Sequence, residues 1–147
     1  MKKLIIYTDG GSRGNPGPSA VGVVLANEKG KVIKEYSESI GVGTNNEAEY
    51  KAVIFALKKA KALYGKKVIK TLAVEVKSDS ELLIKQLNGK YKILEPKIQS
   101  LFISVWNLTL DFKKVKFTSI SREKNSRADK LVNEALDQNL TKPLALL

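Results

Sequence analysis

Two residue types that carry much of the chemistry of enzyme sites are missing from this chain, which has no cysteine and no histidine. Without cysteine there is no disulfide, no thiolate metal site and no catalytic thiol. Without histidine there is no Ser-His-Asp or Cys-His arrangement and no histidine-ligated zinc. Any metal must therefore be held by oxygen atoms, which favour hard divalent cations such as magnesium or manganese.

Long hydrophobic runs are missing as well. The longest uncharged stretch with helical character, residues 98–110, is well short of the roughly 20 residues that cross a bilayer. Near the N-terminus only residues 4–8 separate Lys2 and Lys3 from Asp9, which is too short an apolar run for a secretory signal. We therefore expect a cytoplasmic protein with no membrane partner.

Negative charge is scarce relative to positive charge. The 147 residues include 26 lysines and arginines but only 15 acidic residues, which gives a net charge of +11. A field this positive favours a polyanionic partner, although a lysine coat that keeps the protein in solution would give the same count. The length and the 43% of hydrophobic residues indicate one globular domain that folds without crosslinks.

The hydrophobic pattern predicts elements in the order βββαβααβα. Strands are expected at residues 3–8, 19–26, 31–39, 71–77 and 115–120, and helices at 44–64, 79–88, 95–111 and 126–139. Gly41 and Gly43 are expected to interrupt the pattern after the third strand. Three strands joined by tight connections indicate an antiparallel half, to which strands reached through helices add in parallel. The prediction is an α/β fold with a mixed five-stranded sheet, followed by a short apolar tail at 140–147 that packs on the domain.

Four acidic residues stand in unusual places. Asp9 and Asp79 each follow an apolar strand directly, and ligands of open α/β sheets bind outside the carboxyl ends of strands. Either residue could instead serve as a turn residue or a helix N-cap. Glu49 begins the apolar stripe of its helix, where a carboxylate costs several kcal/mol unless a cation or proton compensates it. A metal or a lysine partner would compensate Glu49.

Asp129 lies in the first turn of the last helix, where it could form a capping pair with Ser126. If the four carboxylates converge at one sheet edge, they repel each other and need divalent cations to stay ionised. In so basic a protein this cluster implies a phosphate substrate. Two cations about 4 Å apart can activate a water and stabilise the leaving oxygen of an in-line phosphoryl transfer.

Four motifs resemble, in order and spacing, those of the type 1 ribonuclease H family. They are residues 7–12 (YTDGGS) with 14–18 (GNPGP), 44–50 (TNNEAEY), 78–80 (SDS) and 125–129 (NSRAD). The resemblance runs from residue 3 to about 139 and implies a ribonuclease H-like catalytic domain over residues 1–139. It further implies an endoribonuclease that hydrolyses the RNA strand of RNA–DNA hybrids with two divalent cations, magnesium or manganese, and leaves 5′-phosphate and 3′-hydroxyl ends.

The resemblance also implies residue roles. Asp9, Glu49, Asp79 and Asp129 match the four metal-binding catalytic carboxylates of the family. The residues implied to bind the hybrid are Gly10, Gly11, Ser12, Asn15, Thr44, Asn45, Asn46 and Ser80. The two glycines would offer backbone amides to the 2′-hydroxyl side of the RNA strand, because glycine lets the chain approach closely.

The chain departs from the family in the loop before Asp129. Many members carry a histidine there that assists proton transfer or product release, whereas this loop reads Ser121-Arg122-Glu123-Lys124. We expect Glu123, as an auxiliary catalytic residue, or Arg122 to substitute in part. This chain matches a subgroup that lacks both the loop histidine and the basic protrusion, because the stretch 88–95 is too short for a protrusion.

Several alternatives remain at this point. Transposases, integrases and junction resolvases share the fold but differ in carboxylate spacing and bring extra DNA-binding domains. A hybrid-binding module that does not cut would be supported by the loss of a carboxylate, and all four are present. A structural domain with a lysine coat does not explain Glu49. We expect a monomer, and we expect Trp106 to lie in the core.

Overall fold

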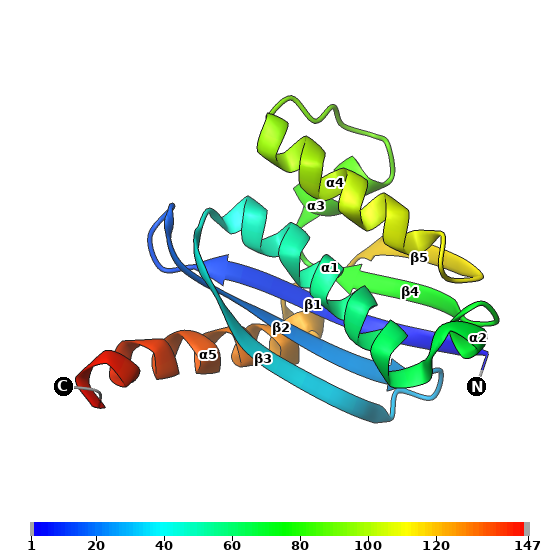
Figure 1. Cartoon of the computed structure of the whole chain (residues 1–147), viewed down its shortest axis with the longest axis horizontal. Helices are drawn as coiled ribbons and strands as arrows, with labels where there is room; N and C mark the ends of the chain where they lie inside the picture. Colours follow the sequence, from blue (N-terminus) through cyan, green and yellow to red (C-terminus); the bar gives the residue numbers. More distant parts are fainter. Residues whose placement is uncertain (1, 146–147) are drawn as a thin grey trace.

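The computed structural model describes the backbone of residues 2–145 and the side chains of residues 2–138. Its centre is a five-stranded sheet with the spatial order β3-β2-β1-β4-β5 (Figure 1). The strands are β1 (Lys3–Ser12), β2 (Gly17–Asn27), β3 (Val32–Gly43), β4 (Ala73–Ser78) and β5 (Lys114–Ser119). Strands β1, β2 and β3 pair antiparallel, whereas β4 pairs in parallel with β1 and β5 in parallel with β4. The predicted α/β fold with a mixed sheet is therefore confirmed.

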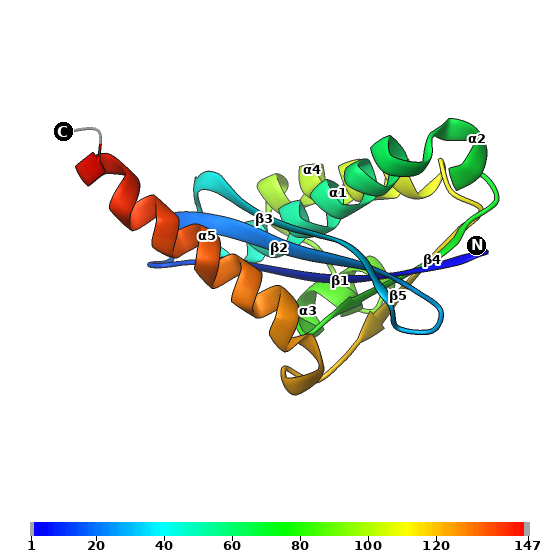
Figure 2. The ribbon, with the colours of Figure 1, turned by 90° about the horizontal axis from the view of Figure 1, so that it is seen from below.

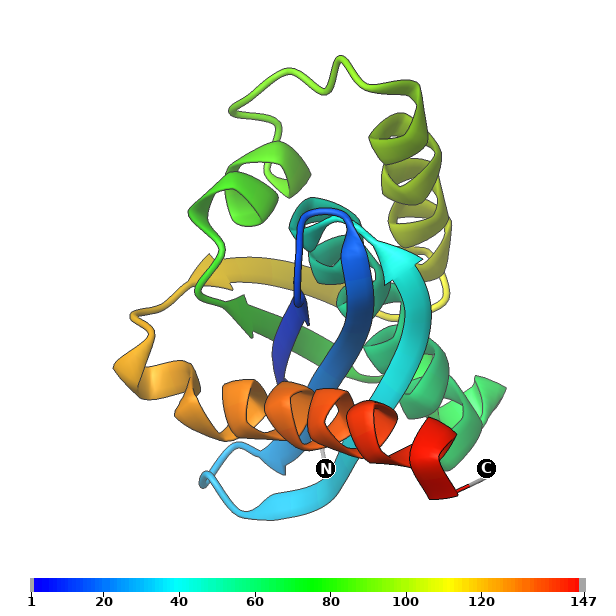
Figure 3. The ribbon, with the colours of Figure 1, turned by 90° about the vertical axis from the view of Figure 1, so that its left-hand side faces the viewer.

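Helices cover both faces of this sheet. They are α1 (Asn45–Tyr64), α2 (Lys66–Ile69), α3 (Glu81–Leu87), α4 (Pro96–Thr109), the 3₁₀ turn η1 (Glu123–Asn125) and α5 (Ser126–Ala145). Helices α1 and α4 lie on one face, and α5 crosses the other face over β1, β2 and β3 (Figures 2 and 3). The four predicted helices are present. The single turns α2 and η1 were not predicted, because one turn is too short to show a hydrophobic period.

Two strands run further than the hydrophobic pattern predicts. Strand β1 continues past Thr8 to Ser12, and β3 continues through Gly41 to Gly43. Both extensions pair with β2, because Gly10 faces Val21 and Gly43 faces Gly17 in the ladder. Polar and glycine residues have a weak preference for strands. Hydrogen bonds to the neighbouring strand thus stabilise them in the sheet.

Helix α1 begins as its sequence predicts. The Thr44 hydroxyl accepts from the Glu47 amide at 3.2 Å, and a Glu47 carboxylate oxygen accepts from the Thr44 amide at 3.4 Å. The other oxygen of Glu47 lies 3.2 Å from the Lys97 ammonium at the start of α4. Burial raises the pKa of Glu47, but Lys97 and Thr44 outweigh this effect and hold it below its usual range. The capping box therefore also joins α1 to α4.

Trp106 is not a core residue, contrary to expectation. Helix α4 buries Ile98 and Val105, which lie two turns apart on one side of the helix. Trp106 follows Val105 by one residue, which turns its side chain about 100° away from that side. Trp106 is 52% exposed. Its place next to Val105 in the sequence therefore does not put it on the buried side of the helix.

The last helix, α5, extends beyond its predicted end. Its backbone is helical to Ala145, well past residue 139. The prediction that the apolar side chains of 140–147 pack on the domain falls outside the described side chains. In the described part of the chain, none of the helices is both long enough and apolar enough to cross a bilayer.

The contact between α5 and the sheet depends on a glycine in β2. A Cβ atom added to Gly22 would lie 2.2 Å from the Ala128 carbonyl oxygen and 2.9 Å from the Leu131 Cβ atom. Ala128 is itself fully buried, so helix and strand approach through two of the smallest residues. The helix that carries Asp129 is therefore held against the sheet at van der Waals distance.

We expect Gly22→Ala to lower the free energy of unfolding by about 2–3 kcal/mol, because the new methyl group meets backbone that cannot rotate away. Urea denaturation followed by circular dichroism measures this loss. The matched control is Gly11→Ala in the neighbouring strand, where the added Cβ meets two side-chain atoms at ordinary contact distance, Val132 Cγ1 at 3.6 Å and Asn45 Oδ1 at 3.9 Å. Equal losses in the two variants would contradict the close helix approach as the cause.

Candidate active site

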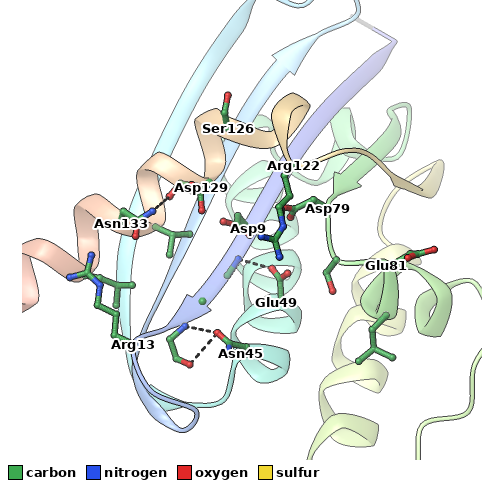
Figure 4. Close-up of a pocket in the computed structure, with 17 residues that line it drawn as sticks. Asp9, Arg13, Asn45, Glu49, Asp79, Glu81, Arg122, Ser126, Asp129 and Asn133 are labelled. Atoms are coloured by element: carbon green, nitrogen blue, oxygen red, sulfur yellow. Dashed lines mark hydrogen bonds and ion pairs between the residues drawn. The ribbon is translucent and has the colours of Figure 1, made fainter.

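Three carboxylates from three elements meet at one edge of the sheet. Asp9 lies in β1, Asp79 directly follows β4, and Glu49 projects from the second turn of α1. Each offers one oxygen atom, and these three atoms lie within 4.8 Å of one another (Figure 4). The parallel pairing of β1 and β4 brings the ends of both strands to the same edge, so the sequence positions of Asp9 and Asp79 converge.

Glu49 is fixed by the strand opposite it. The Gly10 amide donates to Glu49 Oε1 at 2.7 Å. A Cβ atom at Gly10 would lie 2.2 Å from the Ala48 carbonyl oxygen, so only glycine allows β1 and α1 to approach this closely. The resemblance implies that the Gly10 amide contacts substrate. In the structure this amide is hydrogen-bonded to the Glu49 carboxylate, because the strand lies directly against the helix.

Asp129 completes the group from the other side of the sheet. It lies in the first turn of α5, is exposed, and is close enough to Asp9 to raise the pKa of that carboxyl. Ser126 has helical backbone angles, φ −59° and ψ −32°, so it does not adopt the extended conformation of a typical N-cap. The four carboxylates singled out in the sequence are therefore brought together by four different elements.

Burial and mutual repulsion make these groups hard to ionise together. Burial, followed by the charges of Asp79 and Asp129, raises the pKa of Asp9 to about 7. Burial and the Asp9 charge also raise the pKa of Glu49 well above its ordinary value, although the Gly10 amide acts in the opposite direction. An all-oxygen donor set whose charges repel one another fits hard divalent cations, which would restore the ionised forms.

One cationic side chain reaches toward the cluster. The Arg122 Nε atom lies 4.0 Å from Asp79 Oδ2, and the Arg122 side chain is 94% exposed. Figure 4 shows this guanidinium group directed toward Asp9, Asp79 and Glu49. An exposed pair of this length contributes little to stability.

The carboxylates lie in an open depression of about 730 Å³, which we call the carboxylate pocket. Five of the eight residues expected to bind substrate line it, namely Gly10, Gly11, Ser12, Asn45 and Ser80. Ser80 also caps α3 by accepting from the Leu83 amide at 3.3 Å. Of the two loop residues considered as replacements for a histidine, Arg122 lines the pocket and Glu123 is not among its lining residues.

The turn between β1 and β2 is fastened to the start of α1. Asn45 Oδ1 accepts from the Ser12 amide at 2.9 Å and from the Ser12 hydroxyl at 3.2 Å. Asn15 Oδ1 accepts from the Asn45 amide at 2.9 Å. Among the described contacts, the carboxamide oxygens of both asparagines are therefore engaged within the protein, which leaves their NH₂ groups as donors for a ligand.

The remaining predicted contacts lie beside this pocket. Asn46 lines a neighbouring groove of about 250 Å³ together with Gln86 and Lys92. Thr44, the N-cap of α1, holds its hydroxyl against Glu47. Asn15, the last of the eight, accepts from the Asn45 amide and so lies against the first residue of α1.

Sequence reasoning missed several residues at this site. Asn133 and Arg13 line the carboxylate pocket. Asn125, which the 125–129 motif contains but to which the sequence assigned no role, is buried. Asn133 follows Asp129 by four residues, a spacing that places both on one helix face and could have identified it. Nothing local marks Arg13, whose guanidinium group lies 2.6 Å from Asp137, a residue 124 positions later in the chain.

Comparison with known proteins agrees with this geometry. Residues 7–135 match the family described as reverse transcriptase-like. Ribonuclease HI of Halobacterium salinarum is 43% identical over 131 residues, which are 89% of this chain and 63% of that protein. The chain thus spans less than two thirds of the length of this relative.

Solved structures are similar over nearly their whole length. LC11-RNase H1, isolated from compost by a metagenomic approach, shares 48% identity with a TM-score of 0.89, covering 95% of this chain and 99% of that chain. A structure of LC11-RNase H1 in complex with an RNA/DNA hybrid shares 46% identity at the same TM-score, covering 93% and 99%.

Without divalent cations, the protein is expected to lose stability as the pH rises. The folded chain holds the Asp9 proton up to about pH 7, whereas the ordinary pKa is 3.8. Between these values the folded state binds more protons than the unfolded state, so the free energy of unfolding falls as the pH rises. Glu49 acts with the same sign.

Asp9→Asn removes this penalty. In chelator at pH 8 we expect its melting temperature to exceed that of the unmodified protein by roughly 3–9 °C, equivalent to about 1–3 kcal/mol. The difference should shrink as the pH falls below the ordinary pKa of 3.8, where Asp9 becomes protonated in both states. Calorimetric melts across this pH range measure it, and a gap that stays constant with pH would contradict the assignment.

Proposed function

Because the chain belongs to the type 1 ribonuclease H family, we propose that it is an endoribonuclease that hydrolyses the RNA strand of RNA–DNA hybrids. The proposed products carry 5′-phosphate and 3′-hydroxyl ends. The single observation that carries the proposal is the meeting of Asp9, Glu49 and Asp79 within 4.8 Å in an open pocket. A related structure that holds an RNA/DNA hybrid supports the choice of substrate.

The four carboxylates Asp9, Glu49, Asp79 and Asp129 would hold two divalent cations, magnesium or manganese. When bound, these cations supply an activated water and neutralise the charge that develops on the scissile phosphate. The Gly10 amide holds Glu49 in place, and the convergence of β1 and β4 places Asp9 beside Asp79. The protein thereby fixes the ligand geometry before substrate arrives, which lowers the cost of reaching the transition state.

Selection of RNA needs donors and acceptors that face the 2′-hydroxyl groups. Candidates are the Gly11 backbone, the Ser12 and Ser80 hydroxyls and the Asn45 carboxamide, which line the carboxylate pocket. Asn46, in the neighbouring groove, extends this surface along the duplex. Asn15 and Thr44 would contact the DNA-strand phosphates near the start of α1. The excess of lysine adds salt-dependent affinity that does not depend on sequence.

The four carboxylates come from one copy of the chain, so the proposed reaction needs no second copy. The monomer expected from the sequence stays a prediction. The cytoplasmic location expected from the sequence stays a prediction. A module that binds hybrids without cutting them is the second reading, and the following experiment separates the two.

We expect magnesium or manganese to support cutting of the RNA strand in a labelled RNA–DNA hybrid, with no cutting of DNA–DNA duplex and none in chelator. Asp9→Asn should lower the rate by about 10³-fold or more, because several kcal/mol of charge stabilisation depend on the metal ligands. Gel analysis of the labelled strands gives the rates, and fluorescence anisotropy gives hybrid affinity, which the variant should keep.

The matched control is Asp111→Asn, which removes a carboxylate that pairs with Lys61 at 2.9 Å, away from the pocket. It should cut at the rate of the unmodified protein. RNA–RNA duplex and single-stranded RNA complete the substrate series. Tight hybrid binding without cutting in either metal would contradict the proposed endoribonuclease and favour the module that only binds hybrids.

We also expect Arg122, and not Glu123, to assist turnover. Arg122→Ala should lower kcat by about 10-fold, because an electropositive donor near the reacting phosphate is lost. Glu123→Ala, its neighbour in the same loop, should change kcat by less than about 2-fold, since Glu123 does not line the pocket. Steady-state kinetics at saturating magnesium compare the two, and a larger effect at Glu123 would reverse the assignment.

A further inference from the structure

Asn125 is a buried polar residue that the proposed reaction does not use. It ends the 3₁₀ turn η1, between β5 and α5, and is 1% exposed. It lies four residues before Asp129 and beneath the carboxylate pocket. Amides this deeply buried normally have hydrogen-bond partners that explain their presence.

The NH₂ group of Asn125 divides its two hydrogens between two ligand-bearing segments. It donates to the Thr8 carbonyl oxygen at 2.9 Å and to Asp79 Oδ1 at 3.3 Å. Thr8 directly precedes Asp9, and Asp79 follows the parallel strand next to it. A single planar group therefore fixes the Asp79 carboxylate relative to the backbone that carries Asp9.

Stability alone does not explain this arrangement. Within the described residues, the buried Oδ1 atom of Asn125 has no hydrogen-bond partner, and burying an unpaired acceptor costs free energy. The docking of α5 has other supports, namely Ala128 against Gly22, Arg127 paired with Glu35, and the Ser37 hydroxyl bonded to the Leu131 carbonyl. The donated bonds are therefore the distinctive contribution of Asn125.

We propose that Asn125 is a positioning residue that orients the Asp79 carboxylate for divalent cations by tying it to the β1 backbone beside Asp9. One oxygen of Asp79, Oδ1, accepts from Asn125, while the other, Oδ2, is the atom nearest to Arg122. Each carboxylate oxygen has more than one acceptor site, so the bond to Asn125 orients the group and still leaves room for a metal. Outer partners of this kind change metal affinity by about 10–100-fold.

The chemistry of this position requires an amide. An isosteric aspartate would turn a carboxylate oxygen toward both the Thr8 carbonyl and Asp79, so two attractive contacts would become repulsive. An alanine would leave the Asp79 carboxylate without its tether. Both variants should therefore weaken metal binding, and the aspartate should also lower stability through Asp79 itself.

This inference rests on the proposed function, in which the carboxylates hold divalent cations. Its test measures metal binding and does not need cleavage. Calorimetric titration of manganese into the 147-residue chain, without nucleic acid, should show affinity lowered by about 10-fold or more for Asn125→Ala and Asn125→Asp. The matched control is Gln86→Ala. Gln86 is also a buried amide, bonded to the Tyr50 hydroxyl at 2.8 Å and the Lys92 carbonyl at 3.4 Å, away from the carboxylates. The Gln86→Ala variant should bind manganese within about 2-fold of the affinity of the unmodified protein.

A second measurement applies if Asn125→Ala fails to fold. In chelator, Asn125→Asp should lower the melting temperature, and this loss should shrink in an Asp79→Asn background, where the repulsion is gone. An equal loss in both backgrounds, or manganese affinity unchanged in a folded Asn125 variant, overturns the inference. If the unmodified protein binds manganese but does not cut hybrids, the proposed function fails while the role of Asn125 stands.

Discussion

Repulsion among carboxylates at the end of β1 is the constraint on which the site depends. Asp9, Glu49 and Asp79 converge within 4.8 Å, and burial raises the pKa of Asp9 and of Glu49. A fold that only needed stability would not gather these groups, because each costs free energy to ionise beside the others. The arrangement becomes favourable when divalent cations and a phosphate backbone are present. The folded protein is thus less stable at this site, because the proposed chemistry requires charged groups close together.

Close packing on both faces of the sheet makes this gathering possible. Gly10 lets α1 approach β1 so that a backbone amide reaches Glu49, and Gly22 lets α5 approach β2 so that Asp129 stands over Asp9. These glycines lie on adjacent strands, one register position apart, because Asp9 faces Gly22 in the ladder. Helices from opposite faces therefore bring their acidic residues to the same strand end. Asn125 adds a buried tie between β1 and Asp79 beneath them.

The charge of the pocket is opposite to that of the whole chain. The centre of the pocket is acidic, whereas the chain as a whole carries a net charge of +11. An acidic centre alone would repel a nucleic acid, so the proposed substrate would need the excess of basic residues and bound cations to hold it. Arg122 is exposed and near Asp79, where it can contact both the protein and a bound phosphate. This arrangement suits a substrate recognised by backbone charge and shape.

The sequence by itself determined the element order, the capping box at Thr44, and the four acidic positions, because hydrophobic period, capping and motif spacing are local properties. It did not determine the length of β1 or β3, the exposure of Trp106, or the commitment of the Gly10 amide to Glu49. It also gave no sign of which loop residue reaches the pocket, or of the bonds from Asn125 to Thr8 and Asp79. These features depend on partners far away in the chain, such as the 39 positions between Gly10 and Glu49. Only the tertiary structure decided them, because hydrogen bonds and close contacts between distant segments form when strands and helices are packed together.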